Sequence, residues 1–327
     1  MNARSTRSLF IYGMIFISAL CLSNPAAAQN YPAKPVRIIV PFAAGGMTDV
    51  LVRKLAQAVS PALKQPVIID TKPGGSMIIG AEAAAKSAPD GYTLFIGTST
   101  SQVINPLIFP KLPYDPARDF EAIVPISNIE YVLCVNESVP VKTVREFVQY
   151  AKDRPGQLNY ATYGNGTSVH LGMELFKQTA GIDLVHIPFK GSAPSEQELA
   201  SGRVEAMITA FSVLNFVKQG RVRVLAVTMA KRSAALPEVP TIAESGYPGF
   251  ESTSWYGLFA PRGTPKEVVR RWNMEMNKAL KSPEIADWLR SVGLEPTGGS
   301  PEDLAALVQS ETRKYKPVVV RAGIKAD

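Results

Sequence analysis

The chain has 327 residues, of which 46% are hydrophobic and 19% are charged, and its formal net charge is +7 at pH 7. This length is enough for two domains that each bury a core. Two cysteines and two histidines are too few for a disulfide-stapled scaffold or for a metal site with His/Cys ligand spacing. The basic residues are scattered, which favours a solvated basic surface over a nucleic-acid interface.

The first 28 residues have the pattern of a secretory signal peptide. Arg4 and Arg7 precede an apolar run at residues 9–22, which is followed by small residues ending at Ala28. The run is shorter than the ~20 residues that a membrane-spanning helix needs. We therefore expect cleavage near Ala28 and export to the periplasm of a Gram-negative bacterium. The mature chain then keeps one cysteine, Cys134, and cannot form an intrachain disulfide.

Strands and helices alternate in the first part of the mature chain. A buried strand is predicted at Val36–Val40, and in the helix that follows, apolar residues recur at every fourth position from Leu51 to Leu63. Further strands are predicted at 67–70 and 93–97, with a helix at 77–86 between them. This alternation implies a parallel sheet with helices on both faces.

The middle of the chain repeats this plan without repeating the sequence. Thr143 and Glu146 form a capping box that predicts the start of a helix. Strands are predicted at residues 158–161, 184–187, 206–209 and 224–227. The C-terminal stretch is predicted to be mostly helical, because a cap residue precedes a proline at Thr264-Pro265, Ser282-Pro283 and Ser300-Pro301. The sequence thus predicts an α/β protein with two lobes.

The sequence contains no convincing set of catalytic residues. Ser168 and His170 are close in the chain, but a nucleophile needs a base on a separately positioned element and an orienting acid. His186 occupies an alternating position in a predicted strand, which favours a structural role. Because there is also no G-x-S-x-G or S-x-x-K motif, we expect a protein that is not an enzyme and holds no metal.

Two glycine-rich turns lead directly from a predicted strand into a predicted helix, at residues 41–48 and 162–168. Free N–H groups at a helix start, with the positive end of the helix dipole, can bind a carboxylate or phosphate. An ordinary strand-to-helix connection can have the same composition. Neither turn is a G-x-G-x-x-G or Walker loop, so no nucleotide cofactor is indicated. A third, hydroxyl-rich turn at 97–101 follows another strand, at the edge where open α/β sheets bind ligands.

Short motifs in a fixed order cover essentially the whole mature chain. They include Pro41-Phe42-x-x-Gly45-Gly46-x-Thr48-Asp49, Pro89-Asp90-Gly91-Tyr92-Thr93-Leu94, His186-Ile187-Pro188-Phe189-Lys190-Gly191, Trp255-Tyr256-Gly257-Leu258-Phe259-Ala260-Pro261 and Ala322-Gly323-Ile324-Lys325-Ala326-Asp327. In these motifs the chain resembles the tripartite tricarboxylate transporter substrate-binding proteins, the Bug receptors.

The resemblance implies a type II-like periplasmic-binding-protein fold, in which two α/β lobes are joined by two crossing segments and a ligand cleft lies between them. Lobe 1 would combine residues 29–127 with 254–327, and lobe 2 would comprise residues 128–253. The expected function is to capture a small carboxylate and to deliver it to the membrane subunits of the transporter. We expect a monomer that binds no nucleic acid and no cofactor.

The resemblance also implies ligand-binding residues in loops on both sides of the cleft, where backbone amides and hydroxyls hold the carboxylate, partly through water. The first loop would supply Phe42, Ala43, Ala44 and Gly45, and the second Thr98, Ser99 and Thr100. The opposing lobe would supply Asn165, Gly166, Thr167, Ser168 and His170, with Phe189, Lys190 and Gly191 at the border of the cleft. Lys190 is either a ligand cation or a solvated side chain.

One motif departs from the family pattern. Members often carry Phe-Asp-Asn after the strand that here contains Ala206-Met207-Ile208, whereas this chain continues Thr209-Ala210-Phe211. An acidic group is therefore missing at the cleft edge, so that a cationic amino group has one partner fewer and an apolar or aromatic carboxylate is favoured. Two other functions stay open: a secreted hydrolase that uses Ser168, and a periplasmic sensor that presents its bound state to a membrane signalling protein.

Overall fold

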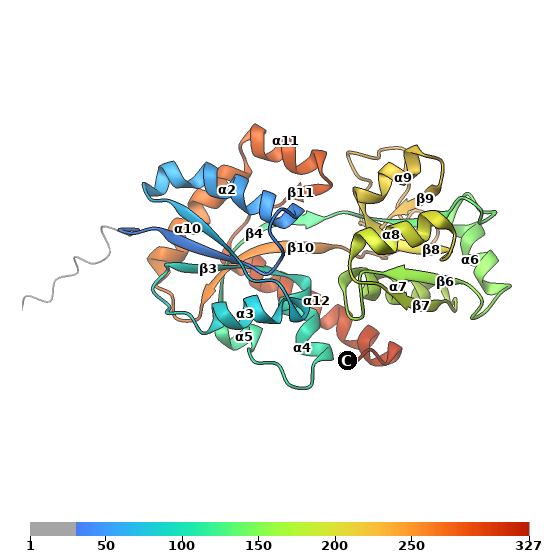
Figure 1. Ribbon diagram of the computed structural model, residues 1–327, viewed down its shortest axis with the longest axis horizontal. Helices are drawn as coiled ribbons and strands as arrows, with labels where there is room; N and C mark the ends of the chain where they lie inside the picture. The colour runs from blue at the N-terminus through green and yellow to red at the C-terminus, as the bar shows by residue number, and fades with distance from the viewer. Residues whose placement is uncertain (1–30, 327) are drawn as a thin grey trace, which may run out of the picture. The chain divides into compact units, whose positions relative to one another are not determined.

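The computed structural model describes residues 31–326, so the predicted signal peptide and its cleavage site near Ala28 lie outside the described residues. Two sheets organise this part of the chain (Figure 1). Sheet A has six strands in the order β11-β4-β10-β3-β1-β2, and sheet B has five in the order β7-β6-β8-β5-β9. No helix within residues 31–326 combines the length and the apolarity needed to cross a membrane.

Sheet A is mixed, not purely parallel as the alternation of elements predicted. Its strands are β1 (Val36–Val40), β2 (Val67–Thr71), β3 (Thr93–Thr98), β4 (Phe120–Ile129), β10 (Ser254–Pro261) and β11 (Leu294–Pro296). Strand β1 pairs in parallel with β2 and β3, but β10 runs antiparallel to both β3 and β4. The reason is that β10 returns from sheet B instead of following a crossover helix within sheet A.

The helices of sheet A pack on both of its faces. They are α2 (Met47–Leu63), α3 (Ile78–Ala85), α4 (Asn105–Ile108), α5 (Pro116–Asp119), α10 (Lys266–Leu280), α11 (Pro283–Ser291) and α12 (Pro301–Ala322), with the short helices η1 (Gly75–Met77) and η2 (Thr100–Ile104). Figure 1 shows α2 and α3 on opposite sides of strands β1 and β3. Ile39 and Phe95 share one buried cluster with side chains of α3 and α12. The predicted amphipathic helix after β1 is confirmed, since Leu51, Leu55 and Val59 are all buried.

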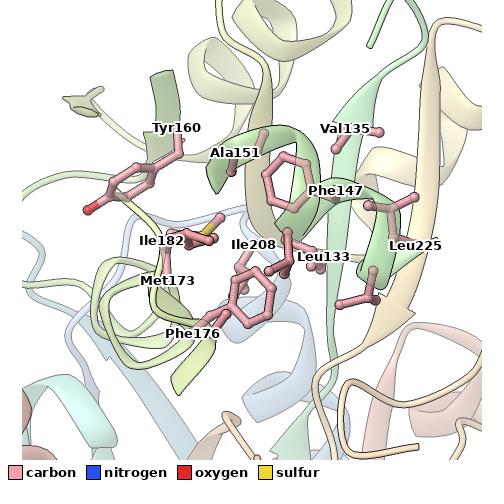
Figure 2. Packing of buried hydrophobic residues seen from close by; sticks show 14 of the residues in the cluster. Leu133, Val135, Phe147, Ala151, Tyr160, Met173, Phe176, Ile182, Ile208 and Leu225 are labelled. Atoms are coloured by element: carbon pink, nitrogen blue, oxygen red, sulfur yellow. The ribbon is translucent and has the colours of Figure 1, made fainter. Parts of the chain in front are cut away.

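Sheet B divides its core between two faces. Its strands are β5 (Tyr131–Asn136), β6 (Asn159–Thr162), β7 (Val185–Pro188), β8 (Ala206–Ala210) and β9 (Val222–Val227), and its helices are α6 (Val144–Lys152), α7 (Ser168–Ala180), α8 (Ser192–Ser201), η3 (Phe211–Val213) and α9 (Leu214–Lys218). Because strand side chains alternate, Leu133 and Val135 pack with α6 and α7 (Figure 2), while Val132 and Cys134 pack in a second cluster with α8.

The chain passes between the two sheets twice. Strand β4 in sheet A ends at Ile129, and β5 in sheet B begins at Tyr131. The return path leads from the end of β9 to β10, which pairs with β4. Two passages between the sheets are what the family resemblance implied. The residues at which the lobes divide, 127/128 and 253/254, stay a prediction.

Most of the helix N-caps predicted from the sequence are confirmed. The hydroxyl of Thr143 accepts a hydrogen bond from the Glu146 N–H at 3.1 Å, and Ser282 and Ser300 cap α11 and α12. The cap predicted at Thr264 is wrong, because the N-cap residue of α10 is Pro265 and no side chain caps this helix.

Candidate ligand-binding site

A cavity of about 510 Å³ is lined by residues from both sheets and from the helices that follow their strands. Its wall consists of Phe42, Met47, Met77, Thr98, Thr100, Ile129, Tyr131, Tyr163, Thr167, Ser168, Gly191, Ser192, Ala210, Phe211, Ser212, Ser254, Tyr256, Val292, Gly293 and Leu294. The volume suits a small organic molecule. None of these described residues carries a charged side chain.

The structure brings six of the residues predicted from the sequence together on the cavity wall. They are Phe42, Thr98, Thr100, Thr167, Ser168 and Gly191. They come from both glycine-rich turns, from the hydroxyl-rich turn after β3 and from the start of α8. Residues of these separate loops therefore line one cavity, and their role in binding a ligand stays a prediction.

The other predicted residues do not line this cavity. Ala43, Ala44, Gly45 and Lys190 are exposed, Phe189 is half-buried, and the buried Ser99 forms a hydroxyl pair with Ser254 at 2.6 Å. Asn165 donates from Nδ2 to the Lys325 carbonyl at 2.8 Å. Gly166 lies against α4, where a Cβ atom at this position would come within 2.2 Å of the Ile108 Cδ1 atom.

His170 supports the second glycine-rich turn from behind. Its Nδ1 atom accepts a hydrogen bond from the Gly166 N–H at 3.1 Å, and its ring stacks on that of His186 with the centroids 3.8 Å apart. Burial lowers the pKa of His170 to about 3 and that of His186 to about 4. His186 forms a 2.7 Å hydrogen bond with the Thr162 hydroxyl. The structural role expected for His186 fits these contacts.

The N-terminus of α7 opens onto the cavity. Its N-cap residue, Thr167, gives no side-chain cap, and its hydroxyl donates to the Gly164 carbonyl at 2.9 Å. Among residues 31–326, the N–H groups of Ser168 and Val169 have no protein acceptor. Since the first turn of α7 contains no acidic residue, the positive end of its dipole is uncompensated.

The helices that open onto the cavity lack side-chain caps as a group. Helices α2, α7 and α8 each begin at a cavity residue, Met47, Ser168 and Ser192, and none has a capping side chain. The helices that are capped by a side chain, α5, α6, α11 and α12, all begin elsewhere, but α4, α9 and α10 also lack such a cap and begin away from the cavity. Among these three helices the first turn contains an acidic residue only in α2, where Asp49 accepts from the Gly45 N–H, and the first turns of α7 and α8 contain none.

The Ser168 hydroxyl pairs with the Tyr131 hydroxyl at 2.9 Å, not with a base. His170 is two residues further on, but its Nδ1 atom is occupied by the Gly166 N–H and its ring faces His186. The geometry that would activate Ser168 as a nucleophile is thus missing between these two side chains.

Much of the cavity wall was not identified from the sequence. Met47, Met77, Ile129, Phe211, Val292 and Leu294 make a large part of the wall apolar. Tyr131, Tyr163 and Tyr256 also line it, and the Tyr256 hydroxyl forms a 2.8 Å hydrogen bond with that of Thr48. The departure from the family pattern after β8 marked the position of Phe211, but no signal in the sequence pointed to the residues of β5 and β10.

Comparisons with known proteins agree with this geometry. The model of the tripartite tricarboxylate transporter family receptor matches residues 51–324. The protein BugT of Bordetella pertussis is 34% identical over 322 residues, which are 98% of each chain. Among solved structures, R. palustris Rpa4515 with adipate is 40% identical with a TM-score of 0.81, over 90% of this chain and 99% of that one. MatC of Rhodopseudomonas palustris with bound malate is 31% identical with a TM-score of 0.76, over 88% and 100% of the two chains.

These likenesses extend over nearly the whole described chain and include the strands that pass between the two sheets. They confirm the predicted two-lobed periplasmic-binding-protein fold. The chain belongs to the tripartite tricarboxylate transporter receptor family.

Proposed function

We propose that this protein is a periplasmic solute-binding protein that captures a small carboxylate in the cavity between its two sheets and delivers it to the membrane subunits of a tripartite tricarboxylate-type transporter. The observation that carries the proposal is the uncapped N-terminus of α7 at the cavity wall. A carboxylate would accept hydrogen bonds from the Ser168 and Val169 N–H groups and would complement the dipole of α7.

Hydroxyl groups around this point would form the remaining hydrogen bonds to the ligand. Ser168, Thr98 and Thr100 line the cavity and come from both sheets' loops. In the same proposal Gly166 and His170 shape the turn from behind, and residues 43–45, Asn165, Phe189 and Lys190 border the entrance without forming the wall. Lobe 1 comprises residues 29–127 and 254–327, and lobe 2 comprises residues 128–253.

The proposal can be tested by a thermal-shift screen of the purified mature protein against mono-, di- and tricarboxylates of two to eight carbons, followed by calorimetric titration of the hits. A ligand at 100 times its dissociation constant should stabilise the protein by roughly 2.7 kcal/mol. Matched primary amides, which keep the shape but lose the negative charge, serve as controls. Binding of the amides with the affinity of the acids, or no binding of any acid, would contradict the proposal.

Binding without turnover is part of the same proposal. Because the Ser168 hydroxyl is paired with Tyr131 instead of a base, the protein should not hydrolyse carboxylic esters, and ester turnover that is lost in Ser168→Ala would revive the hydrolase alternative. A sensor would bind the same ligands. Uptake of the radiolabelled ligand by cells, lost when the gene for this chain is deleted, distinguishes delivery to a transporter from signalling.

Export with cleavage near Ala28 is also proposed, and mass spectrometry of the protein released by osmotic shock tests it. The family membership and the apolar run at residues 9–22 support this location. A mature chain that begins at Gln29 is the expected product.

A further inference from the structure

Glu196 is a buried carboxylate that lies one hydrogen bond behind the cavity wall. It is 4% exposed and belongs to α8, whose first residue, Ser192, lines the cavity. Its Oε1 atom accepts a hydrogen bond from the Ser212 hydroxyl at 2.5 Å and another from the Thr209 hydroxyl at 2.7 Å. Burial raises the pKa of Glu196, and the hydrogen bonds from Ser212 and Thr209 oppose this rise because they stabilise the ionised form. Among residues 31–326, no Lys or Arg forms an ion pair with it.

The hydrogen bonds around Glu196 fix the direction of three hydroxyl protons. The carboxylate can only accept, so Ser212 and Thr209 must both donate to it. Since the single proton of Thr209 is used in this way, Tyr163, whose oxygen lies 2.7 Å from the Thr209 hydroxyl, must donate to Thr209. The Tyr163 oxygen also accepts from the Ala210 N–H at 2.9 Å.

These hydrogen-bond directions determine which groups of the cavity wall can donate a hydrogen bond to a ligand and which can only accept one. Ser212 and Tyr163 both line the cavity, yet their protons point away from it toward Glu196. At Ser212 only oxygen lone pairs remain for the ligand, and an uncompensated negative charge stands behind them. A hydroxyl or amino group of the ligand would therefore be bound here, and a second carboxylate would be repelled.

We propose that Glu196, acting through Ser212, makes the cavity selective for a carboxylate that carries a hydrogen-bond donor at its other end, a hydroxyl or an amino group, over the dicarboxylate of equal length. This inference rests on the proposed function, because it assumes that a carboxylate binds at α7. It also restores an acidic group near the position where the sequence lacks the aspartate of the family pattern. Glu196 acts as a positioning residue for Ser212 and does not itself reach the ligand.

The test is calorimetric titration of the mature protein with ligands matched in length. One set is succinate, 4-hydroxybutanoate and 4-aminobutanoate, and the other is adipate, 6-hydroxyhexanoate and 6-aminohexanoate. In at least one set the wild type should bind the hydroxy or amino acid at least tenfold more tightly than the diacid. The hydroxy and amino members distinguish a neutral donor from a cation.

The variant Glu196→Gln keeps the shape and one accepting oxygen but removes the charge. In this variant the dissociation constant of the diacid divided by that of the donor ligand should fall at least tenfold. The main cause should be tighter binding of the diacid. Ser212→Ala, which leaves the buried carboxylate in place, should weaken the donor ligand at least fivefold and change the diacid less. Glu311→Gln is the matched control, since Glu311 is also a buried carboxylate but bonds Lys314 and does not line the cavity. It should leave the ratio unchanged.

Different results would overturn different claims. If the wild type binds the diacid as tightly as the donor ligand, or if Glu196→Gln weakens all ligands by one common factor, Glu196 does not set the specificity. If circular dichroism shows that Glu196→Gln does not fold, the ratio of dissociation constants measured for Ser212→Ala decides the question alone. If no carboxylate of either set binds the wild type, this inference fails, whereas the proposed function fails only if no acid of the wider screen of mono-, di- and tricarboxylates binds.

Discussion

His170 is a buried imidazole whose neutral form the structure requires, because its Nδ1 atom accepts the hydrogen bond of the Gly166 N–H at 3.1 Å. The groups that face it are His186, Tyr160 and, through the field of its charge, Lys177. Glu174, which pairs with Lys177 and Tyr160, stands nearby. Burial, assisted by His186 and Lys177, lowers the pKa of His170 to about 3, well below the ~6.5 of an unfolded chain.

The sign of the pH effect follows from this shift. Below pH ~6.5 the unfolded chain binds a proton at this position that the folded chain does not, so stability falls as the pH falls, until the pKa of about 3 is reached. The slope for one such group is at most ~1.4 kcal/mol per pH unit. We predict that between pH 6.5 and 5 the unfolding free energy of the wild type falls by up to ~2 kcal/mol more than that of His170→Asn, a variant that keeps a hydrogen-bond acceptor for the Gly166 N–H. Urea unfolding of both proteins at several pH values measures this, and equal slopes would contradict it.

Gly166 illustrates the limit of reading single residues from the sequence. Its place in a glycine-rich turn before a helix suggested that the ligand's carboxylate touches its backbone. In the structure its φ is +69°, its N–H bonds His170, and its Cα faces Ile108 of the other sheet's helices. Glycine is required here for a left-handed backbone and for close packing, two needs that give the same sequence signal as ligand contact.

At the scale of elements, helix α7 carries the site, and its open N-terminus leads to a prediction in which stability and binding move in opposite directions. Asp is a better N-cap than the non-capping Thr167, so Thr167→Asp should raise the unfolding free energy by ~0.5–1 kcal/mol. The new carboxylate would occupy the N–H groups that the ligand needs and would repel it. Carboxylate affinity should therefore fall at least tenfold, or ~1.4 kcal/mol.

Helix α6 supplies the matched control for this change. Thr143 already caps α6 by accepting from the Glu146 N–H at 3.1 Å, and it does not line the cavity. Thr143→Asp should leave both stability and affinity nearly unchanged. Chemical denaturation and calorimetric titration of the two variants give the comparison. A Thr167→Asp protein that binds the carboxylate as tightly as the wild type would mean that the anion is held elsewhere.

The elements themselves were largely predictable, because their patterns are local. Strand β1 and helix α2 follow directly from hydrophobic periodicity. The wall residues of β5 and β10 were not predictable. Every residue of both strands is buried, so no alternation distinguishes the side that faces the cavity from the side that faces the core. Tyr131, Ser254 and Tyr256 reach the site only because these strands carry the chain from one sheet to the other.

At the scale of the whole molecule, the two sheets are separate hydrogen-bonded units. Strand pairs join β4 only to sheet A and β5 only to sheet B, with Glu130 between them. Contacts away from the cavity also link the two sets of elements. Gln178 of α7 donates to the Val318 carbonyl of α12 at 3.3 Å, and Ile108 packs on Gly166. The two sheets can therefore move relative to each other at the cavity, about the two passages, while these contacts restrain the motion on the side of α12.

A ligand that bridges loops of both sheets should draw them together, because only then are both sets of hydrogen-bond donors satisfied at once. We predict that saturating carboxylate lowers the radius of gyration measured by small-angle scattering. Thr167→Asp, titrated over the same ligand concentrations, controls for effects of the ligand on the solvent, and its radius should fall only at the higher concentrations at which calorimetry shows its weakened site to be filled. The radius of gyration of the wild type should fall only at ligand concentrations at which calorimetry shows that the cavity is occupied. If it stays constant at full occupancy, the loops of the two sheets already stand at their bound separation, and the ligand enters a preformed cavity.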